Sequence, residues 1–374
     1  MSAAAPMDGP TSSRIGGQRP NDGPGRLRRE QSTLASLSTG RIPLLKRVAN
    51  EQIVGGSLSP SQPTSKIPDR FSVSERGVNA APIKRIDVSV TIVTWNSAAV
   101  IRRCLKALES ATDGLRVEVH VVDNASTDVT CDLVAREFPE VKLLRGATNE
   151  GFARANNRSW PEARGRYWLL LNADTEVGPG SIKQLVDFAD RHPRSGLVTA
   201  RLQNPDGTPQ HCAQRVPSVP LIAIEALRLH KLMSKNRRAG LLLGPYFSYE
   251  HPMRVGWTWA TALLARREAV ESVGPLSPAF FMYGEDLEWC LRMRRVGWEI
   301  WFCPEATVTH LSGHSALQRW DERNRQALVT EGCYRALAMH RGALRVRLLR
   351  AATAVARGIE VMLHPWGATR PRKS

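Results

Sequence analysis

The sequence predicts an α/β fold in residues 86–315, with a mostly parallel sheet that is covered by helices on both faces. Runs of β-branched residues alternate along this segment with stretches in which apolar residues recur at helical spacing. The connections between them are short, and this alternation is typical of a parallel sheet. The chain has 374 residues, of which 42% are hydrophobic, so it can bury a core of this kind.

The expected elements follow one another in a regular order. Residues 87–95 (DVSVTIVTW) form a continuous β-branched and apolar run, as in a strand buried on both faces. Residues 98–110 then carry apolar side chains on one helical face. Further strands are expected at residues 116–122, 141–144 and 167–171. Further helices are expected at residues 128–138, 152–157 and 181–191.

Most of the charge lies at the two ends of the chain. Of the formal net charge of +17, residues 1–85 carry +7 and residues 315–374 carry +8. The central domain is therefore nearly neutral, and we expect no nucleic-acid partner. Residues 1–85 are rich in Ser, Pro, Gly and Arg without sustained periodicity, which predicts a disordered basic N-terminal tail.

The C-terminal segment, residues 316–374, reads as a basic amphipathic helical extension. Such a helix suits an anionic membrane surface, and a helix packed on the domain with a solvated basic face is the alternative. No apolar run reaches the ~18–20 residues of a membrane span, and no secretory signal is recognisable. The six cysteines contain no CxxC pair, which favours reduced thiols. The expected location is cytoplasmic, peripheral on the inner face of the cell membrane.

Polar clusters end three successive expected strands. They are Thr94-Trp95-Asn96, residues 123–128 and Asn172-Ala173-Asp174. Ligands of open α/β sheets bind at the carboxyl ends of the strands, so three such clusters predict one site. No GxGxxG follows the first strand and no GxxxxGK[ST] occurs in the chain, which disfavours a dinucleotide site and a P-loop.

The acidic residues allow more than one interpretation. Asp174 suits a divalent cation carried by phosphate oxygens, or a turn or helix cap. Asp123 suits a hydrogen bond from a pyrimidine base, or an Asx-turn that supports its own loop. Asp286, in a cluster with Glu285 and Glu288, suits a general base, or an ordinary acidic helix start. His310 follows a probable strand and suits a metal or phosphate ligand.

The motifs together carry a family resemblance that no single motif would. In chain order they are VSVTIVTWN, VVDNASTD, TNEGFARANN, YWLLLNADTEV, FFMYGEDLEWCLRMRRVGW and ATVTHLSGHS. This series resembles the family 2 glycosyltransferases of the GT-A fold, and most of all their rhamnosyltransferase-like branch. The resemblance covers residues 86–315, with residues 205–254 as an insertion on the acceptor side that has no motif of its own.

The resemblance implies a role for each site residue. Asp286 would be the catalytic base, and Asp174 and His310 would hold a divalent metal, Mg²⁺ or Mn²⁺. Trp259 and Glu285 would lie on the acceptor side. The nucleotide-sugar-binding residues would be Thr94, Asn96, Asp123, Gly151, Asn156 and Asn172.

The implied reaction is an inverting sugar transfer by single displacement from a nucleotide diphosphate sugar. Within this branch the expected donor is dTDP-rhamnose, and the expected acceptor is a cell-envelope polysaccharide or a polyprenyl-linked sugar. Two alternatives stay open. A nucleotidyltransferase uses a similar sheet and similar acids but needs a basic Gly-rich loop after the first strand. A non-catalytic protein would use its basic ends to bind nucleic acid or an anionic surface.

Overall fold

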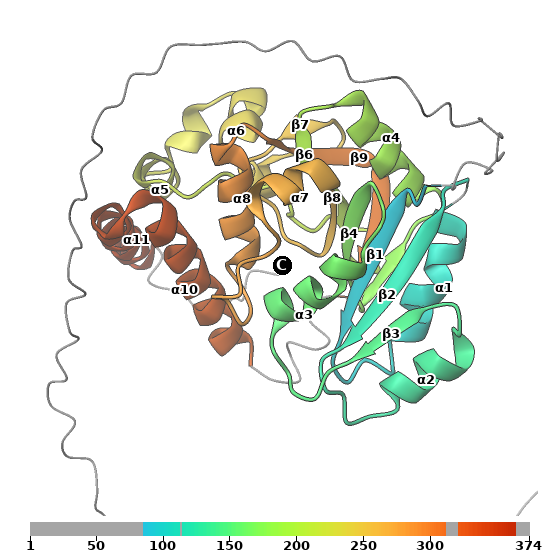
Figure 1. Ribbon diagram of the computed structural model, residues 1–374. Coiled ribbons are helices and arrows are strands. Elements are labelled where there is room, and N and C mark those ends of the chain that lie inside the picture. The colour runs from blue at the N-terminus through green and yellow to red at the C-terminus, as the bar shows by residue number, and fades with distance from the viewer. Residues whose placement is uncertain (1–84, 113, 312–320, 364–374) are drawn as a thin grey trace, which may run out of the picture. The chain divides into compact units, whose positions relative to one another are not determined.

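The computed structural model describes residues 85–363, except residue 113 and residues 312–320 (Figure 1). The tail predicted for residues 1–85 therefore lies outside the described residues, apart from Arg85. No helix in the described part of the chain is long and apolar enough to cross a bilayer.

A parallel four-stranded unit forms the first half of the sheet. It consists of β1 (Val88–Thr94), β2 (Val117–Asp123), β3 (Lys142–Arg145) and β4 (Tyr167–Asn172). The order is β3-β2-β1-β4, and Thr94 lies opposite Asp123 in the register. The connecting helices are α1 (Ile101–Ala111), α2 (Thr130–Glu137) and α3 (Phe152–Ser159), with a 3₁₀ turn at Trp160–Glu162.

The second half of the sheet mixes strand directions. Strand β8 (Ala262–Arg266) is antiparallel to β4 and to β6 (Ser195–Gln203), whereas β6 and β9 (Glu299–His310) are parallel. The short strands β5 (Thr175–Val177) and β7 (Met253–Arg254) both run antiparallel to β9. The helices of this half are α4 (Ser181–Arg191), α7 (Arg267–Val273) and α8 (Glu285–Arg295). The predicted α/β sheet with helices on both faces is confirmed, with antiparallel strands added beyond β4.

Two helical segments complete the fold. Residues 205–254 contain α5 (Val219–Ala226), α6 (Lys235–Leu242) and 3₁₀ turns at Leu229–Leu232 and Gly244–Tyr246. Helix α5 does not continue into the 3₁₀ turn at Leu229–Leu232, because Arg228 between them has a φ of 55°. Beyond residue 320, α10 (Glu322–Arg341) packs on α8, and α11 (Ala343–Leu363) packs on α5 (Figure 1).

Buried tryptophans connect the sheet to α8. Trp168 of β4 and Trp289 of α8 are both fully buried, and their rings meet edge to face with centroids 6.0 Å apart. The indole N–H of Trp168 donates to the Thr91 hydroxyl at 2.8 Å, so its polar atom is satisfied. Trp289 is thus a core residue, and this contact fixes α8, which begins with Glu285 and Asp286, against the sheet.

Candidate active site

The ends of β1 and β2 are tied together by Asp123. Its side chain is 2% exposed, and its carboxylate accepts hydrogen bonds from the Thr94 hydroxyl at 3.2 Å and from the Ser126 amide at 3.0 Å. Asp123 therefore supports its own loop, although the bond reaches the amide three residues on and not the second amide of an Asx-turn. Asn96 has a φ of 49°, and its side-chain oxygen accepts from the Thr127 amide at 2.8 Å. Thr94, Asn96 and Asp123 thus share one corner of the carboxyl edge of the sheet.

Asn124, which has no separate role in the predicted site, organises the neighbouring turn. Its amide nitrogen donates to the Asn149 side chain at 2.9 Å and to the Gly151 carbonyl at 3.2 Å. Its amide oxygen accepts from the Glu150 backbone at 2.8 Å. The predicted nucleotide contact Asn156 is buried on α3, where its side chain donates to the Phe152 carbonyl one turn earlier.

Gly151 joins this turn to the loop that leads into α8. It has a φ of 84°, and the next amide, that of Phe152, donates to the Phe281 carbonyl at 2.7 Å. A Cβ at Gly151 would lie 2.1 Å from the Phe281 carbonyl oxygen. Only glycine allows this close approach of the two backbones.

Gly151→Ala is expected to lower the free energy of unfolding by about 2–5 kcal/mol, because left-handed strain and steric overlap add. Gly180→Ala is the matched control, since Gly180 also has a positive φ, 66°, but nothing within 4 Å of its Cβ position. The control should lose only about 1–2 kcal/mol. Urea unfolding of both variants measures the difference, and equal losses would contradict the proposed overlap.

The third cluster brings Asp174 together with His310. Asp174 follows β4 and is 8% exposed, and a carboxylate oxygen lies 3.3 Å from Nε2 of His310, the last residue of β9. The backbone amide of Leu311 donates to the Asp174 carbonyl at 2.9 Å. Asn172 is held at the end of β4, where its backbone amide donates to the Thr261 carbonyl at 2.9 Å.

Gln210 orients the His310 ring. The Gln210 amide nitrogen donates to the His310 carbonyl at 2.9 Å and to the Asn204 side chain at 2.8 Å. Its oxygen therefore faces Nδ1 of His310 at 2.8 Å and accepts the Nδ1–H. This arrangement assigns the ring proton to Nδ1 and turns Nε2 toward Asp174. Gln210 carries no signal in the sequence, because it lies 100 residues from His310 in a segment without a motif.

The donor set of this pair fits a divalent cation that is shared with a diphosphate. The described residues contain no cluster of three or more His, Cys, Asp or Glu side chains that could hold a metal by themselves. Asp174 and His310 offer one carboxylate oxygen and one imidazole nitrogen on the same side. Mg²⁺ in particular is usually bound by one or two carboxylates plus substrate phosphates, and His is a common ligand of transition metals.

Glu285 and Asp286 form a buried acidic pair at the start of α8. Each is 4% exposed, and Gly284 before them has a φ of 98°. Burial raises the pKa of both carboxyls well above their ordinary range, and for Glu285 the neighbouring Asp286 charge raises it further. Among the described residues, Glu285 Oε2 has no hydrogen-bond partner. Two buried carboxylates with raised pKa values are more than a helix start needs.

Glu288 serves structure instead. It forms an ion pair with Arg292 at 2.8 Å, and its other oxygen lies 3.0 Å from Nε2 of His340 on α10. Helix α10 also approaches the turn before Glu285, because a Cβ at Gly332 would lie 2.3 Å from the Tyr283 carbonyl. The sequence did not predict that the C-terminal segment supports the site.

The segment before β8 contacts both Asp286 and the end of the strand that leads to Asp174. The backbone amide of Ala260 is among the groups that favour the ionised form of Asp286, and the Thr261 carbonyl accepts from Asn172, two residues before Asp174. Trp259 is half-buried beside them, and its ring meets Trp257 edge to face at 4.6 Å. The base candidate and the metal candidate therefore lie at the same edge of the sheet.

Comparison with known proteins identifies the family. Residues 89–239 match the family model of glycosyl transferase family 2. An N-acetylglucosaminyl-diphospho-decaprenol L-rhamnosyltransferase of Mycobacterium tuberculosis is 31% identical over 252 residues, which cover 60% of this chain and 76% of that protein. A low-salt glycan biosynthesis hexosyltransferase of Haloferax volcanii, Agl10, is 26% identical, with 60% of this chain and 67% of that one covered.

Solved structures give a more distant likeness. The mannosyltransferase PcManGT of Pyrobaculum calidifontis, in complex with GDP-Man and Mn²⁺, has a TM-score of 0.47 and 18% identity over 77% of this chain and 81% of that one.

A nucleotide-sugar-dependent glycosyltransferase is the class that these findings define. The chain belongs to glycosyl transferase family 2, and its relatives include a rhamnosyltransferase, as the sequence predicted. Family membership favours this prediction over a nucleotidyltransferase and over a non-catalytic binding protein.

Proposed function

We propose that the protein transfers L-rhamnose from dTDP-rhamnose to a hydroxyl of a lipid-linked sugar, with inversion at the anomeric carbon. The sugar and the acceptor class follow from the activity of the mycobacterial relative. The observation that carries the reaction type is the segment 260–261, which contacts both Asp286 and the strand end before Asp174.

Each part of the site has one task in this reaction. The corner of Thr94 and Asp123 offers buried polar groups for the nucleobase. Asp286 accepts the proton of the acceptor hydroxyl as its oxygen attacks the anomeric carbon, so a single displacement needs no enzyme nucleophile. Asp174 and His310 would hold Mg²⁺ or Mn²⁺, which when bound stabilises the negative charge of the departing diphosphate.

A donor screen tests this proposal. The full-length protein is incubated with a panel of nucleotide sugars and Mg²⁺ or Mn²⁺, and thermal stabilisation and slow donor hydrolysis are measured. The expected result is a metal-dependent response that is strongest with dTDP-rhamnose. A stronger response to another donor would replace the sugar assignment, and a folded protein that responds to no donor would remove the proposed reaction.

Gln210→Leu is expected to lower the affinity for Mn²⁺, measured by calorimetry in the presence of dTDP, by about 10–100-fold. The reason is that the variant no longer accepts the Nδ1–H of His310, and such partners orient ligand histidines. Gln210→Glu keeps an acceptor for the Nδ1–H but loses the two amide donations, so it should bind Mn²⁺ more tightly than the Leu variant without reaching the wild-type affinity. If the Leu and Glu variants bind Mn²⁺ equally, Gln210 does not position His310.

A further inference from the structure

Exposed apolar side chains gather on two neighbouring segments of the chain. One segment is α5 with the turn that follows it, and the other is α11, which packs against α5 (Figure 1). Between 40% and 85% of each of these side chains is exposed: Val219, Leu227, Leu229, Leu232, Leu344, Leu348 and Val355. A patch of this kind on a soluble domain marks an interaction surface.

Helix α11 has two apolar faces. Val346 and Leu349 are 6% and 5% exposed and pack into the protein. Leu344, Leu348 and Val355 are spaced by four and seven residues, so they share the opposite face, which points outward. The inner face accounts for the packing of α11, and the outer apolar face is not needed for it. Arg345 and Arg347 flank this outer face on its two sides.

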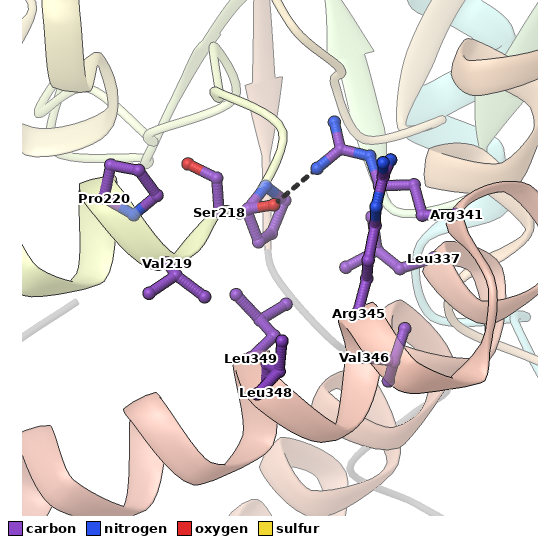
Figure 2. Close-up of a pocket in the computed structure, with 10 residues that line it drawn as sticks. Ser218, Val219, Pro220, Leu337, Arg341, Arg345, Val346, Leu348 and Leu349 are labelled. Atoms are coloured by element: carbon purple, nitrogen blue, oxygen red, sulfur yellow. Dashed lines mark hydrogen bonds between the residues drawn. The ribbon is translucent and has the colours of Figure 1, made fainter.

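A pocket of about 240 Å³ lies between the two segments (Figure 2). Its apolar wall includes Val219, Pro220 and Leu349, and Arg341 and Arg345 also line it (Figure 2). Arg341 donates to the Pro217 carbonyl at 3.1 Å. An apolar surface edged by guanidinium groups suits an amphiphile that carries phosphate.

The arginines continue from the pocket along the surface without carboxylate partners. Burial and the nearby charges of Arg294 and Arg345 lower the pKa of Arg341, and burial and Arg294 lower the pKa of Arg215. Within the described ranges, no carboxylate forms an ion pair with Arg215, Arg294 or Arg341. The repulsion among these like charges would be relieved by an anionic partner.

We propose that α5, residues 227–232 and the outer face of α11 form a docking surface for an anionic phospholipid bilayer. The leucines and valines enter the boundary of the acyl chains, and the arginines contact the lipid phosphates. The apolar residues of the surface are aliphatic and flanked by arginine, as in helices that lie in the plane of the interface. The protein is then peripheral on the cytoplasmic face of the membrane.

The docking surface goes beyond sugar transfer but suits the proposed acceptor. Arg294 and Asp286 both belong to α8 and are eight residues apart, about 12 Å along the helix axis. A bound bilayer would therefore lie close to α8, the helix that carries the candidate base, because Arg294 is near enough to Arg341 of the pocket for its charge to lower the pKa of Arg341. Binding to vesicles needs no nucleotide sugar, so it can be tested separately from the proposed reaction.

Sedimentation with vesicles tests the surface. Full-length protein is mixed with vesicles of phosphatidylglycerol and phosphatidylcholine in equal amounts, or of phosphatidylcholine alone. The variant Leu344→Gln/Leu348→Gln is expected to bind the anionic vesicles at least about tenfold more weakly, because two leucines no longer enter the apolar layer. The control Val129→Gln/Val296→Gln changes side chains that are 63% and 57% exposed elsewhere, and it should bind within about twofold of the wild type.

Charge reversal provides the second comparison. Arg345→Glu/Arg347→Glu should weaken binding to the anionic vesicles at least about tenfold. Lys106→Glu/Arg191→Glu alters the net charge equally at exposed positions outside the surface, and it should have a much smaller effect. All variants are checked for wild-type thermal unfolding.

Three outcomes would overturn the proposal. The first is equal weakening by the surface variants and by their controls. The second is wild-type binding that does not depend on phosphatidylglycerol. The third is a concentration-dependent dimer, seen by sedimentation velocity without vesicles, that Leu344→Gln/Leu348→Gln abolishes, because the surface would then be the site of self-association.

Discussion

Asp286→Asn is expected to lower the turnover number about 10²–10⁴-fold while the protein stays folded. Asparagine has nearly the same shape as aspartate but does not accept a proton from the acceptor hydroxyl at neutral pH. The side chain is buried at the start of α8, where the Ala260 and Leu287 backbone amides favour its ionised form. The measurement is steady-state kinetics with the donor that the screen identifies.

The pH dependence of the wild type gives an independent readout. Because burial raises the pKa of Asp286, the acid limb of kcat/KM should lie well above the ordinary aspartate value of about 3.9. The folded state prefers the neutral acid, so this group stabilises the protein fully below its unfolded pKa. That contribution is lost as pH rises through the folded pKa. As the pH rises from about 5 to 8, the free energy of unfolding of Asp286→Asn should therefore fall less than that of the wild type.

Glu285→Gln separates the base from its neighbour. Glu285 is as buried as Asp286 but is not the proposed proton acceptor, so this variant should keep most of the turnover. Its acid limb should stay close to that of the wild type, because burial and backbone hydrogen bonds, and not a charge on Glu285, set the pKa of Asp286. A Glu285→Gln variant as inactive as Asp286→Asn, or an Asp286→Asn variant with wild-type turnover, would exchange or remove the base assignment.

The parts of the site that the sequence predicted are those with local signals. Asp123 and Asp174 each end a strand whose β-branched or apolar run is visible in the sequence, and the rule of carboxyl ends then places them together. Glu285 and Asp286 stand out because charged residues rarely follow an aromatic run into a buried helix.

The parts that were missed depend on contacts between distant segments. Gln210 reaches His310 across 100 residues, and His340 reaches Glu288 across 52. Periodicity and spacing report only the geometry of a segment with itself. The direction of β8 is a similar case, because a short apolar strand of Ala and Leu looks the same in the sequence whether it runs parallel or antiparallel to β4.

Asp174→Ala is expected to remove the metal-dependent part of donor binding and to lower the turnover number about 10³-fold. The carboxylate is one of the two side chains that would hold the proposed divalent cation, and its partner His310 lies 3.3 Å away. The nucleobase contacts proposed for Thr94 and Asp123 do not involve the cation. The variant should therefore still bind the nucleoside diphosphate, but with an affinity that no longer rises when Mn²⁺ is added.

Calorimetry of nucleoside diphosphate binding with and without Mn²⁺ distinguishes this effect from a loss of fold. Glu176→Ala is the matched control, because Glu176 lies two residues further along the same turn and strand and pairs with Arg103 at the surface, 3.3 Å away. The control should keep the full response to Mn²⁺. If the response persists in Asp174→Ala, the cation is held elsewhere, and the pairing of Asp174 with His310 then serves to fasten β5 to the end of β9.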